Sequence, residues 1–342
     1  MDSTFYNNDF RDSLISVVIP CRNEKKFIQE TINSILTQKD INKNFEIIVV
    51  DGQSEDGTRE ILNELKLLDK RIKILDNPQK ITPVALNIGI KKAKGDFIFI
   101  LGAHAKIDED YISSCLKIFD EHPEVSCAGG PIISKGNSLL GKAIALAMSS
   151  PVGVGNAKHR FPDYEGYAEM ACFPAFKKEV FNKIGYYDER LVRNQDDDFC
   201  FRLRLKGDKV YISPKVKSIY YVRDNLKSLF KQYYQYGFWR VELLAKHKLP
   251  VALRQQIPFL FFLCMILLII ISLAVNKPII GITLPALYLT TLFIYSIIKF
   301  IKEKKLYVFW LPVVIFTLHI SYALGFASSL IKKIFKKIRN KD

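Results

Sequence analysis

Short apolar blocks alternate with amphipathic ones between residues 14 and 101. Four blocks are typical of strands: LISVVIP, FEIIVVDG, RIKILDN and DFIFIL. FEIIVVDG is apolar at nearly every position, which predicts a strand buried on both faces of a parallel sheet. The intervening segments carry apolar residues at helical spacing, as in EKKFIQETINSILTQ, GTREILNELKLL and TPVALNIGIKKAKG. Repeated strand–helix units predict an α/β fold with a doubly wound sheet and a ligand crevice at the carboxyl ends of its strands.

Polar or small residues stand where these strands end. They are Asn23 and Glu24 after the first strand, Asp51 at the second, Asn77 after the third and Gly102–His104 after the fourth. Because parallel strands end at one edge of a sheet, we expect these residues to lie near one another. The alternation by itself favours a nucleotide-binding fold without identifying the nucleotide.

The pattern is looser between residues 112 and 225. A helix is expected over 112–121, and the apolar segment SLLGKAIALAMSSPVGVG is too short and glycine-rich to span a membrane. We expect it to form a buried or interface-lying helix followed by a loop. The stretch 176–207 predicts a helix, a turn at Gly185, an acidic cluster and a second helix.

The last part of the chain has the composition of membrane helices. Three apolar runs cover Ile257–Val275, Pro278–Ile298 and Leu306–Ile331. Each is near the roughly 20 residues that a helix needs to cross a bilayer. Three such runs in succession favour membrane helices over buried helices of a soluble core. We divide the chain into an N-terminal tail (1–13), an α/β domain (14–225), interfacial helices (226–256), a membrane region of two or three helices (257–331) and a basic tail (332–342).

The net charge of +15 concentrates beside the apolar runs, in KFIKEKK and KKIFKKIRNKD. Such clusters bind anionic lipid head groups, so we expect membrane lipids and no nucleic acid as partners. The polar start MDSTFYNNDFRDS has no apolar core of a signal peptide. Six scattered cysteines indicate buried thiols in a reducing compartment. We therefore expect a multi-pass protein of the inner or cell membrane with a cytoplasmic catalytic domain.

The third apolar run leaves two alternatives open. With a cytoplasmic N-terminal domain, a third crossing would place the basic tail outside, against the positive-inside rule. Either the rule fails here, or Leu306–Ile331 does not cross fully. Pro312 and Gly325 are compatible with a bent or re-entrant segment.

Four motifs occur in order along the chain: VVIPCRNE, EIIVVDGQSEDGT, LNIGIKKAKGDFIFIL and NQDDDFCFRLR. Over residues 14–245 the chain resembles family 2, inverting glycosyltransferases of the GT-A fold, and it is most similar to the succinoglycan-type exopolysaccharide enzymes. Rossmann dehydrogenases are a poorer match, because no G-x-G-x-x-G follows the first strand. The resemblance implies a GT-A, Rossmann-like nucleotide-diphospho-sugar transferase domain followed by transmembrane helices.

The resemblance also implies a nucleotide-sugar site. The loop PCRNE would line the nucleotide pocket, with Asn23 and Glu24 near the ribose and base. Asp51 would accept a hydrogen bond from a base N–H or a ribose hydroxyl, or else serve as a turn residue. Asp96 would lie near the nucleotide, or only open its strand. The implied set comprises Pro20, Arg22, Asn23, Glu24, Asp51, Asn87, Asp96, Gly102 and Ala103. Ser54, Asp56 and Gly57 are expected to be structural residues of a turn and helix start.

Gly102, Ala103 and His104 stand where the family has an Asp-x-Asp motif that binds Mg²⁺ or Mn²⁺ at the diphosphate. The succinoglycan-type relatives resemble Asp-Ala-His here, so only Gly102 departs from their pattern. The resemblance implies His104 as the metal ligand, although a structural histidine is the alternative. A neutral imidazole suits Mn²⁺ better than Mg²⁺.

The segment NQDDDF (194–199) matches the place of the family's catalytic acid. Gln195 replaces a glutamate, Asp196 is implied as the general base, and Asp197 is the second candidate. Adjacent acids repel one another, which raises a pKa if the site is dry; a solvated acidic turn is the alternative.

Arg202 and Arg204 are expected to pair with these acids. In KQYYQYGFWR the chain has a degenerate copy of the Gln-x-x-Arg-Trp element of processive relatives. Gln232 and Tyr236, together with Arg202, are assigned to the acceptor or lipid side, with an aromatic belt at the membrane interface as the alternative.

The expected function is transfer of a sugar, with inversion, from a nucleotide-diphosphate sugar such as a UDP-sugar to a polyprenyl-linked saccharide in exopolysaccharide or capsule assembly. One alternative is a polyprenyl-phosphate sugar synthase. Another is an inactive scaffold subunit, which Gly102 and Gln195 would support.

Overall fold

The computed structural model describes residues 13–41, 44–249 and 252–339. It divides into two compact units. The first comprises Met1–Ile133 with Lys158–Tyr220, and the second comprises Ser134–Ala157 with Tyr221–Asp342. The sequence analysis ends the α/β domain at residue 225, close to the end of the first unit at Tyr220. It gives no sign that residues 134–157 associate with the C-terminal helices.

The first unit is built on an eight-stranded sheet with the order β3-β2-β1-β4-β9-β6-β10-β8. Four strands form its parallel part: β1 (Ile15–Cys21), β2 (Phe45–Asp51), β3 (Ile72–Asp76) and β4 (Phe97–Ile100). The predicted strands are therefore confirmed, and so is the α/β class.

The second half of the sheet departs from a purely parallel arrangement. Strand β9 (Cys172–Lys177) lies between β4 and β6 (Val125–Gly130) and is antiparallel to both. Strand β10 (Lys209–Ile212) is parallel to β6, and β8 (Gly166–Tyr167) closes the edge. Shorter strands are β5 (Lys106–Ile107), β7 (Ile133–Lys135) and β11 (Ser218–Tyr221).

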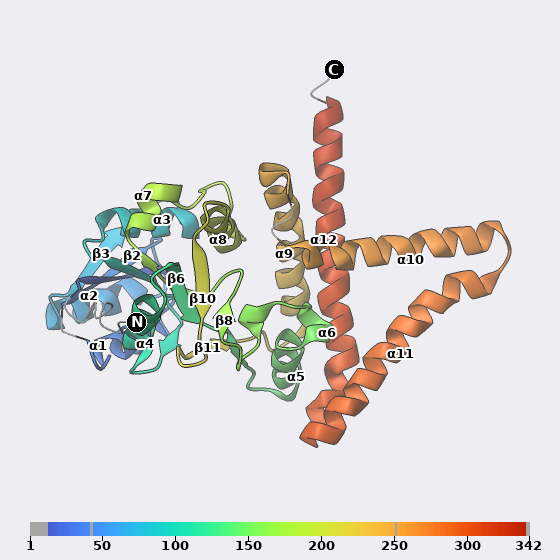
Figure 1. The fold of residues 1–342 in the computed structure, drawn as a ribbon, viewed down its shortest axis with the longest axis horizontal. Helices are drawn as coiled ribbons and strands as arrows, with labels where there is room; N and C mark the ends of the chain where they lie inside the picture. Colours follow the sequence, from blue (N-terminus) through green and yellow to red (C-terminus); the bar gives the residue numbers. More distant parts are fainter. Residues whose placement is uncertain (1–12, 42–43, 250–251, 340–342) are drawn as a thin grey trace, which may run out of the picture. The chain divides into compact units, whose positions relative to one another are not determined.

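Helices cover both faces of this sheet (Figure 1). One face packs against α1 (Ile28–Leu36), α2 (Thr58–Leu68) and α4 (Tyr111–Glu121). The other packs against α3 (Thr82–Lys92), α7 (Glu179–Ile184) and α8 (Gln195–Leu205). Successive strand residues alternate between the two cores: Val17 and Val49 belong to the first, whereas Val18 and Val50 belong to the second. The nearly continuous apolar strands are thus explained, since each face has its own core.

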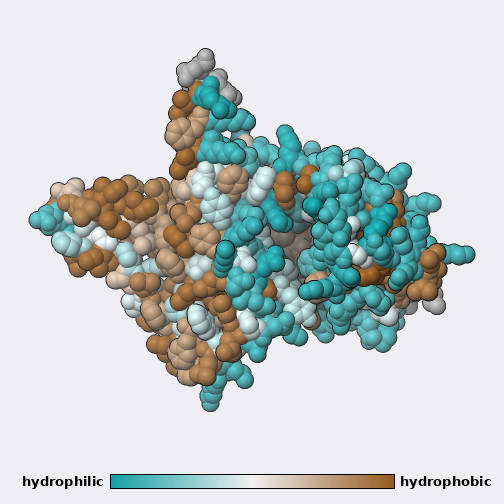
Figure 2. Space-filling model, turned by 180° about the vertical axis from the view of Figure 1, so that it is seen from behind, coloured by the Kyte–Doolittle hydropathy of each residue, from teal (hydrophilic) through white to brown (hydrophobic). Residues whose placement is uncertain are grey.

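The second unit is helical. Its helices are α5 (Leu139–Met148), α6 (Pro151–Val154), α9 (Leu226–His247), α10 (Ile257–Ala274), α11 (Pro278–Glu303) and α12 (Leu311–Arg339). Short 3₁₀ turns precede α10 (Leu253–Gln256) and α12 (Leu306–Trp310), and a third, Lys158–Arg160, belongs to the first unit. Three helical segments are long and apolar enough to cross a membrane: Leu253–Ala274, Pro278–Glu303 and Leu306–Arg339. Figure 2 shows hydrophobic residues gathered on these helices, while the sheet-containing unit is mainly hydrophilic on the face displayed.

Helix α12 is continuous from Leu311 to Arg339, so the bent or re-entrant alternative does not describe it. Pro312 stands in its first turn, where a missing N–H costs no helical hydrogen bond. Gly325 is a packing residue: a Cβ there would lie 2.0 Å from the carbonyl oxygen of Tyr234 in α9. Gly237 of α9 is equally close to the carbonyl oxygen of Tyr322. The two helices therefore cross with their backbones nearly in contact.

Candidate active site

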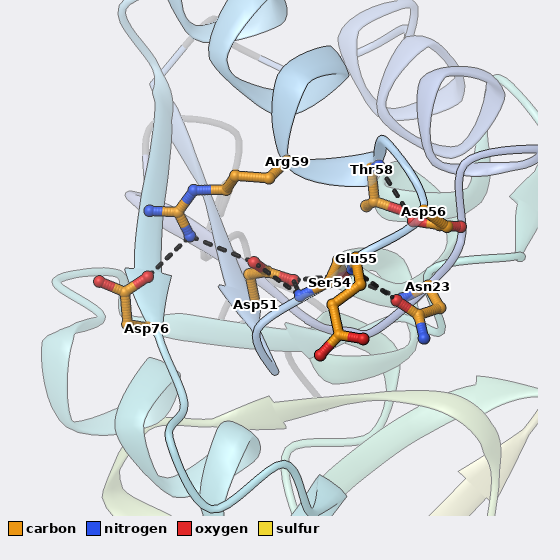
Figure 3. A network of polar contacts seen from close by, with 8 residues as sticks. All are labelled: Asn23, Asp51, Ser54, Glu55, Asp56, Thr58, Arg59 and Asp76. Atoms are coloured by element: carbon orange, nitrogen blue, oxygen red, sulfur yellow. Dashed lines mark hydrogen bonds and ion pairs between the residues drawn. The ribbon is translucent and has the colours of Figure 1, made fainter.

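Asp51 ends strand β2 and is almost completely buried. The Ser54 hydroxyl donates a hydrogen bond to its Oδ1 over 2.6 Å. The guanidinium of Arg59 lies 3.3 Å from its Oδ2 and 2.7 Å from Oδ1 of Asp76 at the end of β3 (Figure 3). Arg59 thus joins the ends of two neighbouring strands, and the carboxylate of Asp51 is held in place by charge and by the following turn.

The loops after β1 and β2 are bonded to each other. The backbone N–H of Asn23 donates to Ser54 Oγ, and the N–H of Glu55 donates to Asn23 Oδ1, each over 2.9 Å (Figure 3). Asn23 has a φ of 56°, a conformation that asparagine tolerates better than most residues. These contacts agree with structural roles for Ser54 and its turn.

Two further residues of PCRNE take different positions. Pro20 lies within β1. The side chain of Arg22 passes over Gly52, where an added Cβ would lie 3.3 Å from it. Arg22 itself is exposed at the same loop. It is therefore available to a ligand, whereas Pro20 is a partly buried strand residue.

His104 and Glu24 form a pair across the ends of β4 and β1. The Nδ1 atom of His104 lies 3.0 Å from Oε1 of Glu24. Because a carboxylate only accepts hydrogen bonds, Nδ1 is the donor, and in the neutral tautomer that this bond favours Nε2 carries a lone pair. The N–H of Glu24 in turn donates to Thr58 Oγ1 over 2.9 Å, and the side chain of His104 is half exposed. A metal-binding histidine is commonly oriented in this way by a carboxylate.

Within the described part of the chain, no three or more histidine, cysteine, aspartate or glutamate side chains gather as a metal cage. The donor set still fits an ion that takes one protein ligand here, with phosphate oxygens and water supplying the others. The hydroxyl of Thr31 donates to the carbonyl of Ala103 over 2.9 Å, which anchors the strand end beside His104.

Asp196 lies in the first turn of α8 and is partly buried. Burial, and then the neighbouring charge of Asp197, raise the pKa of Asp196 to about 7. Gln195 donates a hydrogen bond to Asp196 Oδ2 over 3.3 Å. A carboxylate that titrates near neutral pH has the proton affinity of an effective general base.

The third acid of the cluster has a structural position. Asp198 is fully buried and pairs with Arg202 over 2.9 Å. Arg202 also donates to the carbonyl oxygens of Ile184 and Tyr186 over 2.6 and 2.7 Å. The expected pairing of Arg202 with an acid is therefore seen. Its assignment to the acceptor side is withdrawn, because its guanidinium is committed to the protein. Arg204 lies over the ring of Phe201 instead.

The polar groups of Asn87 and Asp96 form hydrogen bonds within the protein. The amide of Asn87 is buried and bonds to Tyr187 through its N–H and carbonyl groups, and to Glu189. Asp96 immediately precedes β4, at the opposite edge of the sheet from the strand ends, and accepts a hydrogen bond from the N–H of Leu14. We therefore assign neither residue to the nucleotide. Asp96 fits the alternative of a residue that opens its strand.

Gln232 and Tyr236 belong to α9 in the second unit. The amide of Gln232 donates to the hydroxyl of Tyr236 over 3.0 Å, one helical turn away.

Two contacts at the candidate site were not predicted from the sequence. The Glu24–His104 pair joins residues 80 positions apart. Phe173 lies against Gly102. Neither contact has a sequence signal, because both depend on how separate strands end side by side.

Comparisons with known proteins identify the family of this chain. The model of the family described as Glycosyl transferase family 2 matches residues 16–185. The succinoglycan biosynthesis protein ExoA of Rhizobium meliloti (strain 1021) is 32% identical over 249 residues, which are 71% of this chain and 73% of that protein. A second relative, from Methanococcus voltae, is a dolichyl N-acetyl-alpha-D-glucosaminyl phosphate 3-beta-D-2,3-diacetamido-2,3-dideoxy-beta-D-glucuronosyltransferase. It is 27% identical over 327 residues, which are 94% of this chain and 98% of that protein.

A solved structure shares the fold. The mannosyltransferase PcManGT from Pyrobaculum calidifontis, in complex with GDP-Man and Mn²⁺, superposes with a TM-score of 0.62 at 16% identity. The similarity covers 94% of this chain and 88% of that one. The predicted GT-A fold is thereby confirmed.

Proposed function

Because the chain belongs to glycosyl transferase family 2, we propose that it transfers a sugar from a nucleotide-diphosphate sugar to a lipid-linked saccharide, with Asp196 as the general base. That it is a glycosyltransferase follows from the family and the relatives. The observation that carries the proposed mechanism is the pKa of Asp196, which burial and Asp197 raise to about 7. Asp198 and Arg202 hold the helix that presents it.

The reaction we propose is a single displacement. Asp196 accepts the proton of an acceptor hydroxyl, and the hydroxyl oxygen forms a bond to the anomeric carbon of the donor. The bond from that carbon to the nucleoside diphosphate breaks on the opposite face, and the diphosphate leaves with the electron pair. Inversion follows, because one displacement occurs and no covalent enzyme intermediate forms.

The nucleotide would lie at the ends of β1 and β2. Arg22 is exposed there, and Asn23 and Asp51 are held by the bonds between the two loops. We assign base or ribose recognition to this network, with UDP as the first candidate and GDP as the second. The dolichyl-phosphate-linked substrate in the name of the Methanococcus voltae relative supports a lipid-linked acceptor. The three long apolar helices would keep the catalytic unit at the membrane where such an acceptor is found.

His104 is the residue that would hold a divalent ion. A bound Mn²⁺ or Mg²⁺ would neutralise the charge that develops on the leaving diphosphate. The contribution of the chain is orientation: Glu24 fixes the proton on Nδ1, and Nε2 is left for the ligand. Gly102 supplies no carboxylate, so we expect a single protein ligand rather than two.

Turnover of donor by purified protein in detergent tests the proposal. UDP-N-acetylglucosamine, UDP-glucose and GDP-mannose are supplied with and without Mn²⁺. The acceptors are a short-chain polyprenyl diphosphate bearing one sugar and, in a parallel arm, a polyprenyl monophosphate. We expect acceptor-dependent nucleotide release that Asp196→Asn lowers by about 10²–10⁴-fold, the usual contribution of a general base. The exposed Glu64 of α2 provides a control, Glu64→Gln, with unchanged rates.

The metal arm separates His104 from Glu24. We expect His104→Ala to abolish stimulation by Mn²⁺. We expect Glu24→Gln to lower the affinity for Mn²⁺ by about 10–100-fold, as for other residues that orient a metal ligand. Equal stimulation in wild type and His104→Ala would remove the metal assignment. Transfer only to the polyprenyl monophosphate would indicate a lipid-phosphate sugar synthase. Absence of turnover together with absence of donor binding in calorimetry would favour the scaffold alternative.

A further inference from the structure

Phe173 has an uncommon backbone. Nine described non-glycine residues have positive φ, and Phe173, at 42°, is the one aromatic residue among them. The others are asparagine, aspartate, glutamine or lysine. For a bulky side chain this conformation is unfavourable, and it persists only where the surrounding structure enforces it. Such positions are enriched at binding and catalytic sites.

A buried tyrosine enforces this conformation. The hydroxyl of Tyr111, which is fully buried, donates to the carbonyl of Phe173 over 2.6 Å and also contacts the carbonyl of Cys172 at 3.3 Å. Strand β9, to which both carbonyls belong, lies between β4 and β6 in the sheet. The carbonyl direction at Phe173 is therefore held from the core.

The ring lies beside the strand end that carries His104. A Cβ added to Gly102 would lie 3.2 Å from Cε1 of Phe173, a tight contact. The ring therefore lies where a residue other than glycine at position 102 would place its side chain. Phe173 is only partly buried and packs against the core cluster that includes Leu101 and Ala103, whereas neighbouring Cys172 and Pro174 are buried. Because Phe173 is not fully buried, part of this residue remains accessible beside the strand end.

The catalytic acid is near the same point. Burial raises the pKa of the Cys172 thiol to about 12, and the charges of Arg160 and Asp196 act on the same thiol. Phe173 is thus adjacent in the chain to a residue within electrostatic range of the proposed base, and it touches position 102, two residues before the proposed metal ligand. These two neighbours, Cys172 and Gly102, link Phe173 to both halves of the candidate site.

We propose that the ring of Phe173 is the platform on which a pyranose ring lies in the active site, and that Phe173 is a residue that determines sugar specificity. A pyranose presents an apolar face of C–H groups that packs on an aromatic ring, while its hydroxyls remain free to form hydrogen bonds. Gly102 leaves room for the aromatic ring. This inference rests on the proposed function. The pyranose belongs either to the donor or to the acceptor, and the experiment distinguishes them.

Calorimetry and kinetics with Phe173→Leu and Phe173→Tyr test the proposal. Leucine keeps an apolar side chain but removes the aromatic face, and tyrosine keeps the face. For a donor pyranose, we expect Phe173→Leu to weaken binding of the sugar nucleotide by about tenfold and binding of the bare nucleoside diphosphate not at all. For an acceptor pyranose, donor binding stays unchanged and the KM for the polyprenyl-linked acceptor rises by a similar factor. Phe173→Tyr should stay within about twofold of wild type in both arms.

Gly102→Ala provides a second, independent readout. Its added methyl group would push on the ring, so we expect it to weaken sugar binding in the wild-type background and to have a smaller effect in Phe173→Leu. Equal effects of Gly102→Ala in both backgrounds would contradict the contact.

Two outcomes would overturn the platform role. One is a Phe173→Leu variant with wild-type sugar affinity and acceptor KM. The other is a variant that loses nucleoside diphosphate binding together with thermal stability, which would show that the ring only supports the fold. Both leave the proposed function intact if the wild type turns over donor. A wild type that binds no nucleotide would overturn both inferences.

Discussion

The two units of this protein use their apolar residues in opposite ways. In the first, strand residues such as Ile48 are completely buried between the sheet and its helices. In the second, most of α10 is exposed, with Ile266 at 54%. The first unit is stabilised by removing apolar surface from water. The second leaves apolar surface exposed on helices that are long and apolar enough to cross a membrane.

The helices of the second unit associate by a different principle. Where lipid is as apolar as the side chains, burial gives little driving force, and small residues that allow close backbone packing become important. Gly237 and Gly325 bring α9 and α12 into backbone contact. Lys333 of α12 pairs with Glu242 of α9 over 2.7 Å. One chain therefore combines a core of sheet and helices with a helix crossing that depends on two glycines.

The largest expected effect on stability contrasts two isoleucines. Ile48→Ala should lower the melting temperature in detergent by roughly 5–15 °C, because it opens a cavity in a closed core and costs about 2–5 kcal/mol. Ile266→Ala should change it by about 1–2 °C, as is usual for an exposed position. Thermal unfolding followed by near-UV circular dichroism measures both. Similar shifts would mean that α10 is buried in solution.

A smaller effect is expected from the glycine contact. Gly325→Ala forces a methyl group against the α9 backbone and should cost about 1–3 kcal/mol. The matched control is Gly185→Ala, where φ is 79° and no atom lies within 4 Å of the added Cβ. The control should also cost about 1–3 kcal/mol, but through backbone strain alone, because φ 79° with ψ −170° is a conformation that is nearly restricted to glycine. Limited proteolysis of α12 should detect loosening in Gly325→Ala alone, and equal cleavage of both variants would contradict the close crossing.

The third prediction concerns pH in the first unit. A base must be deprotonated to act, so kcat/KM should fall about tenfold per pH unit below the Asp196 pKa of about 7. The same shift affects stability with the opposite sign. Between pH 4 and 7 the folded state holds a proton that the unfolded state has released, so the stability contribution of Asp196 decreases as pH rises.

Asp196→Asn should remove this part of the pH dependence of the melting temperature. A rate profile with its lower limb near pH 4 would show that Asp196 is an ordinary solvated carboxylate.

Much of the architecture could be predicted from local pattern. The first four strands and their helices were predictable because each has a period or an apolar run set by its own burial. The antiparallel insertion of β9 was not, since strand order depends on contacts among distant segments. Nor was the grouping of residues 134–157 with the C-terminal helices. Gly325 was compatible with a bent or re-entrant segment in the sequence, but it is a packing residue in the fold, because its role depends on the distant helix α9.

By itself, the sequence determined the α/β class, the family motifs, the membrane-length helices and the cluster of three acids, because each is written in consecutive residues. Only the tertiary structure decided the surroundings of each of those acids. It committed Asp198 to Arg202 and left Asp196 in a setting that raises its pKa. It also decided that Glu24 orients His104 and that Phe173 faces Gly102. The physical reason is that charge, burial and orientation depend on neighbours in space, and those neighbours are brought together by the sheet.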